Sequence, residues 1–225
     1  VEEGPLADLD LPLLLSQAID RQALIDALEV PGLLPRATLL EPGLDGLADP
    51  VAPQWAAMPM AERRPLLVAA ADRLFGEEER PLLRIALPDG PGTELVLNRL
   101  AQDWGALGIT VERAAAGTPA DLELIDAVAP STSPAWYLRQ FRCGESAVCV
   151  EEADALLEAA RAAPVAAQRA ALLGQAALLM DEAQLFLPLA APIRWSLVSG
   201  HVESFAGNRF ARHTLTALAE KLNND

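Results

Sequence analysis

The sequence predicts an α/β fold, in which helices flank a β-sheet, and three observations support this prediction. The chain has 225 residues with 52% hydrophobic and 22% charged side chains, which is enough to bury a substantial core and too apolar for intrinsic disorder. Short apolar stretches at 82–87, 109–113 and 122–127 have the length and composition of strands. A helical pattern at 93–107 separates the first two, and this order favours a parallel sheet covered by helices.

Two amphipathic helices are expected before the first strand, at 11–28 and 60–75, because apolar residues recur there at helical spacing. The stripe of the second helix consists of Leu66, Leu67, Ala70 and Leu74. Residues 31–53 between them are dense in proline and glycine, which predicts an ordered loop or a linker.

The helix at 93–107 is expected to begin with Thr93 as its N-cap and to stop at Gly108. The Gly90-Pro91-Gly92 turn before it lacks the third glycine of a dinucleotide fingerprint and the lysine of a phosphate loop. We therefore interpret it as a plain connection between strand and helix.

Helices dominate the second half of the chain. After a Pro/Ser/Thr-rich loop at 129–137, helical patterns occupy 150–163 and 165–180. Residues 185–198 read as extended and apolar, and a loop and a terminal helix are expected in 200–225.

The net charge of −15 argues against nucleic acid or an anionic membrane surface as the main partner, since both attract positive patches. No uncharged stretch approaches the roughly 20 apolar residues of a membrane-spanning helix. The charge is compatible with neutral or cationic partners, but it does not identify a particular one.

The sequence contains no recognisable catalytic or metal site. It has no Gly-x-Ser-x-Gly elbow, and its two histidines lie far from any acidic signature. Adjacent carboxylates such as Glu151 and Glu152 point in different directions on a helix, so we interpret them as solvated surface. We expect no catalytic residues, no metal and no cofactor.

Cys143 and Cys149 are separated by five residues, which excludes a CxxC motif. The remaining alternatives are a disulfide that closes a small surface loop and two free thiols. We favour the disulfide, which would indicate an oxidising compartment such as the periplasm.

Trp136 and the hydroxyls of Ser131, Thr132 and Ser133 follow the strand predicted at 122–127. Ligands of open α/β sheets bind at the carboxyl ends of the strands, so this segment is a candidate binding site. A Trp that only packs against the end of the sheet is an equally weighted alternative.

Six segments, taken in order, resemble the peptide/nickel-type extracellular solute-binding proteins of ABC importers, known as family 5. They are LLSQAIDRQALI (14–25), LLEPGL (39–44), DWGALGITVE (103–112), ADALLEAAR (153–161), LPL (187–189) and VESF (202–205). The resemblance covers nearly the whole chain but only the later part of that family.

The resemblance implies the second lobe of a periplasmic-binding-protein type II fold, with a mixed β-sheet flanked by helices. Residues 1–198 would form this lobe, and 199–225 would return toward an N-terminal lobe that this sequence lacks. Two such lobes close on a ligand by hinge motion. The implied function is the substrate-binding component of an ABC importer. The implied partners are the missing lobe, the permease and a small-molecule or peptide ligand, in a periplasmic location with or without an N-terminal membrane anchor.

In peptide-binding members of the family, a loop after a second-lobe strand supplies an aspartate that pairs with the ligand's amino terminus. The matching stretch here is 129–136, where Pro130 and Ser133 stand in place of the acids. The ligand-facing residues that we predict are Ser131, Thr132, Ser133 and Trp136, followed by Asp126 as the nearest carboxylate.

Two other functions remain as alternatives. One is a small α/β hydrolase, against which the lack of a nucleophile elbow counts. The other is a ligand-sensing module of a regulator. Upstream sequence would discriminate transport, with a signal peptide or lipobox, from regulation, with a DNA-binding motif.

Overall fold

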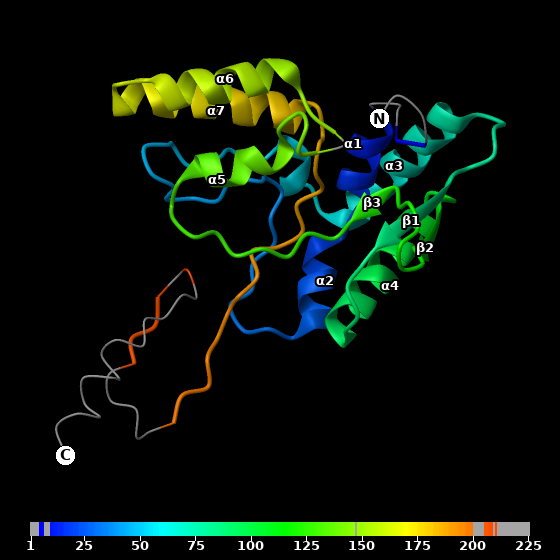
Figure 1. Cartoon of the computed structure of the whole chain (residues 1–225). Helices are drawn as coiled ribbons and strands as arrows, with labels where there is room; N and C mark the ends of the chain where they lie inside the picture. Colours follow the sequence, from blue (N-terminus) through cyan, green and yellow to red (C-terminus); the bar gives the residue numbers. More distant parts are fainter. Residues whose placement is uncertain (1–4, 7–9, 147, 200–204, 209, 211–225) are drawn as a thin grey trace.

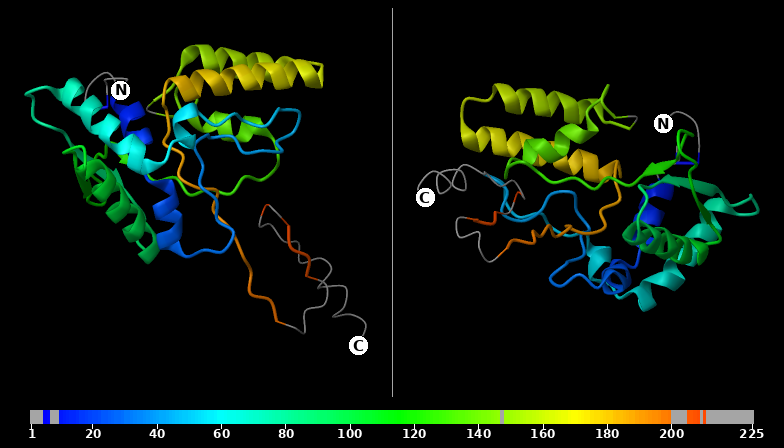
Figure 2. Two further views of the ribbon diagram at one scale, coloured as in Figure 1. Left: turned by 180° about the vertical axis from the view of Figure 1, so that it is seen from behind. Right: turned by 60° about the horizontal axis from the view of Figure 1, so that its bottom comes forward.

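The structure is a computed structural model that describes residues 5–6, 10–146, 148–199, 205–208 and 210. Its elements form two units, each with its own hydrophobic core. Figures 1 and 2 show the sheet with helices α1–α4 at one side of the molecule and helices α5–α7 at the other, joined by irregular segments. The α/β class that the sequence predicts is confirmed.

The sheet has the strand order β2-β1-β3 and is built from β1 (Leu82–Ala86), β2 (Thr110–Arg113) and β3 (Leu122–Glu123). β1 pairs in parallel with both neighbours, with Leu83 opposite Val111 and Ile85 opposite Leu122. We expected a mixed sheet, but the named strands in the described part of the chain are all parallel. Antiparallel pairing occurs there only as an isolated bridge between Pro35 and Ala190.

Helix α4 (Pro91–Gly105) connects β1 to β2 and packs against the sheet. It begins two residues before the predicted start because Gly90 is the N-cap and Pro91, with its fixed φ, suits the first turn. The Thr93 hydroxyl donates instead to the carbonyls of Pro88 and Gly90, at 2.7 and 2.8 Å. The helix ends at Gly105, three residues before the predicted stop, and Gly108, with φ +80°, lies in the turn that follows it.

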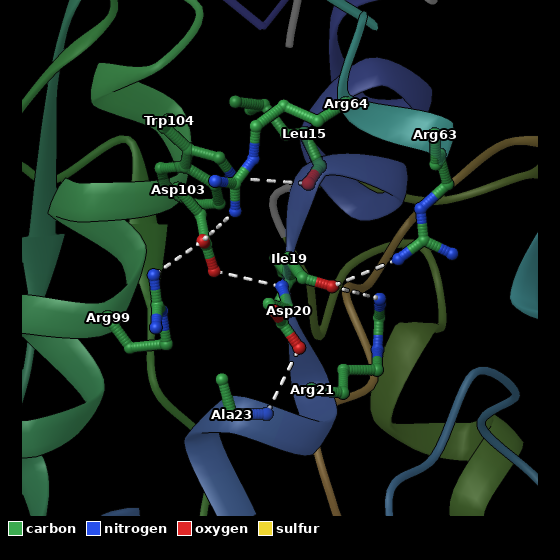
Figure 3. A network of polar contacts seen from close by, with 10 residues as sticks. All are labelled: Leu15, Ile19, Asp20, Arg21, Ala23, Arg63, Arg64, Arg99, Asp103 and Trp104. Carbon is green, nitrogen blue, oxygen red and sulfur yellow. Dashed lines mark hydrogen bonds and ion pairs between the residues drawn. The ribbon is translucent and has the colours of Figure 1, made fainter. Parts of the chain in front are cut away.

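The predicted helix at 11–28 is in fact two helices, α1 (Asp10–Ala18) and α2 (Arg21–Leu28). The side chain of Asp20 accepts a hydrogen bond from Ala23 N–H at 3.0 Å and so caps α2. The backbone N–H of Asp20 donates to Asp103 Oδ2 at 2.8 Å, which ties the break to α4 (Figure 3).

Asp103 is the centre of a buried polar network in the first unit (Figure 3). Arg99 donates to Asp103 Oδ1 at 2.7 Å, and Arg64 lies 3.6 Å from the same oxygen. Burial raises the pKa of Asp103, while the hydrogen bond from Asp20 and the charge of Arg99 oppose that shift. Next to it, the fully buried Trp104 donates from its indole nitrogen to Leu15 O at 3.0 Å.

Helix α3 (Met60–Phe75) confirms the prediction at 60–75, and it packs against α1. Its buried face differs from the predicted stripe, because Leu66 is exposed and Arg63, Leu67 and Ala71 are buried. Residues 31–53 are irregular as predicted and are followed by the 3₁₀ turn η1 (Gln54–Ala57).

The second unit is built on α6 (Glu151–Ala162) and α7 (Ala166–Glu182), which pack against each other as a helical hairpin. Their apolar faces enclose a core that includes Leu157 and Met180 together with Leu40 and Leu44 from the long irregular segment. The disulfide between Cys143 and Cys149, which we predicted, closes the loop before α6. Asp154 of α6 accepts a hydrogen bond from Cys143 N–H at 2.9 Å and holds that loop on the helix.

Residues 185–199 run from α7 back past the first unit (Figure 1). They are irregular, apart from the bridge at Ala190, and Trp195 and Leu197 are 81% and 95% exposed. The boundary that we predict between 198 and 199 stays a prediction, because most of 200–225, including most of the VESF segment, lies outside the described residues. None of the helices in the described part of the chain has the length and apolar character required to cross a bilayer.

Candidate functional site

The segment 124–133 carries most of the predicted site and connects the two units, because it leaves the sheet at the carboxyl end of β3 and leads to α5 (Pro134–Leu138). Figure 1 shows it as the green connection between β3 and α5. The position agrees with the general rule that ligands of α/β sheets bind beyond the carboxyl ends of the strands.

Hydrogen bonds fix the end of this connection, where Ser131, Thr132 and Ser133 lie half-buried. Ser133 N–H donates to Ser131 Oγ at 3.3 Å, and Asp45 N–H donates to Thr132 O at 3.0 Å. The Asp45 contact comes from the long irregular segment 31–53. The three hydroxyl-bearing residues are therefore held in a fixed backbone conformation that joins two distant parts of the chain.

Trp136 belongs to the short helix α5 and not to a loop. The loop that we predict at 129–137 ends at Ser133 in the structure. Pro134 at the first helical position favours this start. Pro134 and Leu138 are the buried residues of this helix. The ring of Trp136 is half-buried and meets Tyr137 edge to face, with ring centroids 5.1 Å apart. The Tyr137 hydroxyl in turn donates to Glu41 Oε1 at 2.7 Å.

Asp126 lies on the same connection, exposed, and forms an ion pair with Arg194 of the segment 185–199. Sequence reasoning missed this partner, because 68 residues separate the two and neither belongs to a recognisable motif. The pair ties 185–199 to the end of β3. Asp126 is therefore paired with a cation of this chain, and a ligand's amino group would have to compete with that cation.

The structure thus places Ser131, Thr132, Ser133 and Trp136 together at the start of α5 and places Asp126 earlier on the same connection. Among the described residues, no group of three or more His, Cys, Asp or Glu side chains could hold a metal ion. Both cysteines are consumed by the disulfide, so neither is available as a thiol nucleophile. What the segment offers is hydroxyls, backbone groups and an aromatic ring, which are groups that bind a small solute.

The arrangement of helices around a small parallel sheet can be compared with known proteins. No family model matches the sequence, and no curated protein matches it either. Solved structures do match. OppA from Burkholderia pseudomallei is 23% identical with a TM-score of 0.69, and the murein tripeptide binding protein MppA from Escherichia coli is 18% identical with a TM-score of 0.73. A periplasmic oligopeptide-binding protein of an oligopeptide ABC transporter from Borrelia burgdorferi (OppAIV) is 17% identical with a TM-score of 0.67.

Each of these matches covers 84% of this chain but only 41%, 40% and 40%, respectively, of the other protein. The chain therefore spans about two fifths of the length of the solved proteins that it resembles. At these identities the likeness establishes the fold, and it confirms the binding-protein fold that the sequence predicts.

Proposed function

We propose that this chain is the second lobe of the substrate-binding component of an ABC importer and binds a peptide-like or other small solute in a cleft between lobes. The observation that carries the proposal is the fold match, which covers 84% of this chain and includes a murein tripeptide binding protein and an oligopeptide-binding protein. On this proposal the bound solute is delivered to a permease, and the protein works in the periplasm and is not an enzyme.

The segment after β3 supplies the proposed contacts with the solute. Ser131, Thr132 and Ser133 would offer hydroxyl and backbone hydrogen bonds, and the half-buried Trp136 ring would cover an apolar part of the ligand. The lack of a carboxylate at positions 130 and 133 supports a ligand held by neutral hydrogen bonds. Asp126 would contribute only if the ligand displaced Arg194.

Titration calorimetry of the two-lobed protein, with this chain as its second lobe, against trialanine and other tripeptides tests the proposed site. We expect Trp136→Ala to weaken binding by at least about tenfold, because a partly buried aromatic contact contributes strongly to affinity. Ser133→Ala should weaken it less. Leu178→Ala, an exposed position on α7, is the matched control and should leave affinity unchanged.

Two results would contradict the proposed site. One is tripeptide binding that Trp136→Ala and Leu178→Ala leave equally unchanged. The other is turnover of an ester or amide substrate by the protein, which would favour the hydrolase alternative.

A further inference from the structure

A pocket of about 440 Å³ lies beside the start of α2, and it is separate from the segment 124–136. Its walls come from the start of α2, from the irregular segment near 35–42, and from the stretch 50–63 that contains η1 and the start of α3. None of the residues proposed to face the transported solute lines it. The volume is within the range of small-molecule sites.

Three arginines line this pocket, Arg21, Arg36 and Arg63, against a single acidic residue, Asp20, among the described lining residues. The Asp20 carboxylate is already engaged as the N-cap of α2. This excess of positive charge stands out in a chain whose net charge is −15. A concentration of like charge on a concave surface attracts an ion of the opposite sign.

Two of these arginines keep unsatisfied donors. Arg63 is 7% exposed, and its Nε–H is buried without a hydrogen-bond partner among the described residues, as is the Nε–H of Arg36. The guanidinium of Arg36 makes no hydrogen bond or ion pair with the part of the chain that the structure describes. Buried donors without acceptors are costly. The remaining N–H groups of the Arg36 guanidinium are donors for an acceptor that enters the pocket.

Unlike Arg36, the guanidiniums of Arg21 and Arg63 are held in place by hydrogen bonds. Arg21 donates from Nε to Pro188 O and from Nη1 to Ser16 O, both at 2.7 Å, and Arg63 donates to Trp55 O at 2.8 Å. Both lie 5.2 Å from the centroid of the Trp55 ring. Figure 3 shows the two side chains converging on the carbonyl of Ile19. Two fixed cations so close together create a preorganised positive site.

The electrostatics agree with this geometry. Burial, followed by repulsion from Arg63, lowers the pKa of Arg21 to about 10, and burial lowers the pKa of Arg63. A bound anion would offset both effects. Most of the remaining wall is apolar and includes Pro42, Pro50, Ala52 and Met58, while Gln22 and Thr38 are its polar members.

From these observations we infer that the pocket bounded by Arg21, Arg36, Arg63 and Trp55 is a second ligand site, which binds a small carboxylate with a short apolar body. The carboxylate would accept hydrogen bonds from the guanidinium of Arg36, beside the fixed positive charges of Arg21 and Arg63. The apolar body would lie on the proline and methionine wall. Charge-assisted hydrogen bonds of this kind are stronger than neutral ones.

Nuclear magnetic resonance of the arginine Nε–H groups tests this site, with hexanoate, neutral hexanamide and sulfate as probes. We expect hexanoate to shift the Nε–H signals of Arg36 and Arg63, and hexanamide and sulfate to bind at least about tenfold more weakly. Arg36→Gln should weaken hexanoate binding by at least about tenfold. Arg73→Gln, an exposed arginine of α3 outside the pocket, is the matched control and should not change it.

Several outcomes would overturn the inference. They are the absence of any shift with hexanoate, equal binding of hexanamide, equal binding of sulfate, and equal weakening by Arg73→Gln. An Arg36 Nε–H signal that is already hydrogen-bonded without any probe would show that another part of the protein fills the pocket. None of these results depends on the solute bound near Trp136, so the two proposals can fail separately.

Discussion

At the scale of single residues, Asp103 connects several helices of the first unit, and no sequence pattern indicates this role. Its carboxylate is buried, accepts from Asp20 N–H and pairs with Arg99. It joins the break between α1 and α2 to the end of α4. Helical periodicity cannot identify such a role. In the sequence, a buried carboxylate is only a polar residue on an apolar helix face, and the partners that stabilise it are not visible.

We expect Asp103→Ala to lower the free energy of unfolding by about 3 kcal/mol, because it leaves the partly buried Arg99 and Asp20 N–H without their acceptor. Urea denaturation measures this change. Asp72→Ala is the control, because Asp72 forms an exposed ion pair with Arg80, and its loss should cost less than about 1 kcal/mol. Equal effects of the two variants would contradict this description of Asp103.

Asp181 near the end of α7 gives a pH-dependent prediction. Burial raises its pKa to about 6, above the value of about 3.9 in an unfolded chain. Between these values the folded state binds more protons, so the contribution of Asp181 to stability is present at low pH and is lost as pH rises through 6.

Asp181→Asn should therefore be more stable than the original protein at pH 7, by about 1–2 kcal/mol after allowance for partial solvent exposure. The difference should disappear toward pH 4. Urea denaturation of both proteins across this range measures it. A difference that does not vary with pH would show that the pKa of Asp181 is not raised.

Among the elements, the break at Ile19 and Asp20 shows where periodicity misleads. The apolar pattern continues from α1 into α2, so a single helix is the natural prediction, yet the Asp20 side chain caps α2. Asp20→Ala should cost about 1 kcal/mol, the usual contribution of a helix cap. Asp26→Ala, at an exposed position on α2, should cost less than about 0.5 kcal/mol in the same urea titration. If Asp20→Ala cost no more than Asp26→Ala, the cap would not stabilise α2.

The loop before α6 is closed by the disulfide between Cys143 and Cys149, which are six positions apart. Removing a cross-link over so short a loop should lower the free energy of unfolding by about 2 kcal/mol. We expect no titratable thiol in the unreduced protein, and about that loss for the double variant Cys143→Ser, Cys149→Ser. Two thiols titrated without reductant would show that the bond does not form.

Elements with strong periodicity were predictable, and those set by long-range contacts were not. Helix α3 and strand β1 agree with the predicted positions to within one residue, although the buried face of α3 differs from its predicted apolar stripe. Helix α5 was missed because it has only five residues and begins at a proline that also suits a loop. The pairing of Asp126 with Arg194 has no local signal at all, since only the folded chain brings these residues together.

At the scale of the whole molecule, the two units and the segment 185–199 meet around the connection after β3. Arg36 N–H donates to Leu189 O at 3.0 Å, and Arg21 donates to Pro188 O, so the same segment contacts both the arginine pocket and Asp126. The proposed solute site and the proposed carboxylate site are thus connected through one stretch of chain. The binding-protein fold was predictable from six short segments in order, whereas the arginine pocket was not.

The most direct test of the proposed function is to identify what the protein retains. The two-lobed protein that the proposal implies, with this chain as its second lobe, would be incubated with a peptide digest, freed of unbound material, and denatured in acid. The released solutes would be identified by mass spectrometry. We predict release of a small solute in near-stoichiometric amount, reduced in Trp136→Ala and unchanged in Leu178→Ala. Release of nothing above the level of a non-binding protein would contradict the proposal that this chain is the lobe of a solute-binding protein.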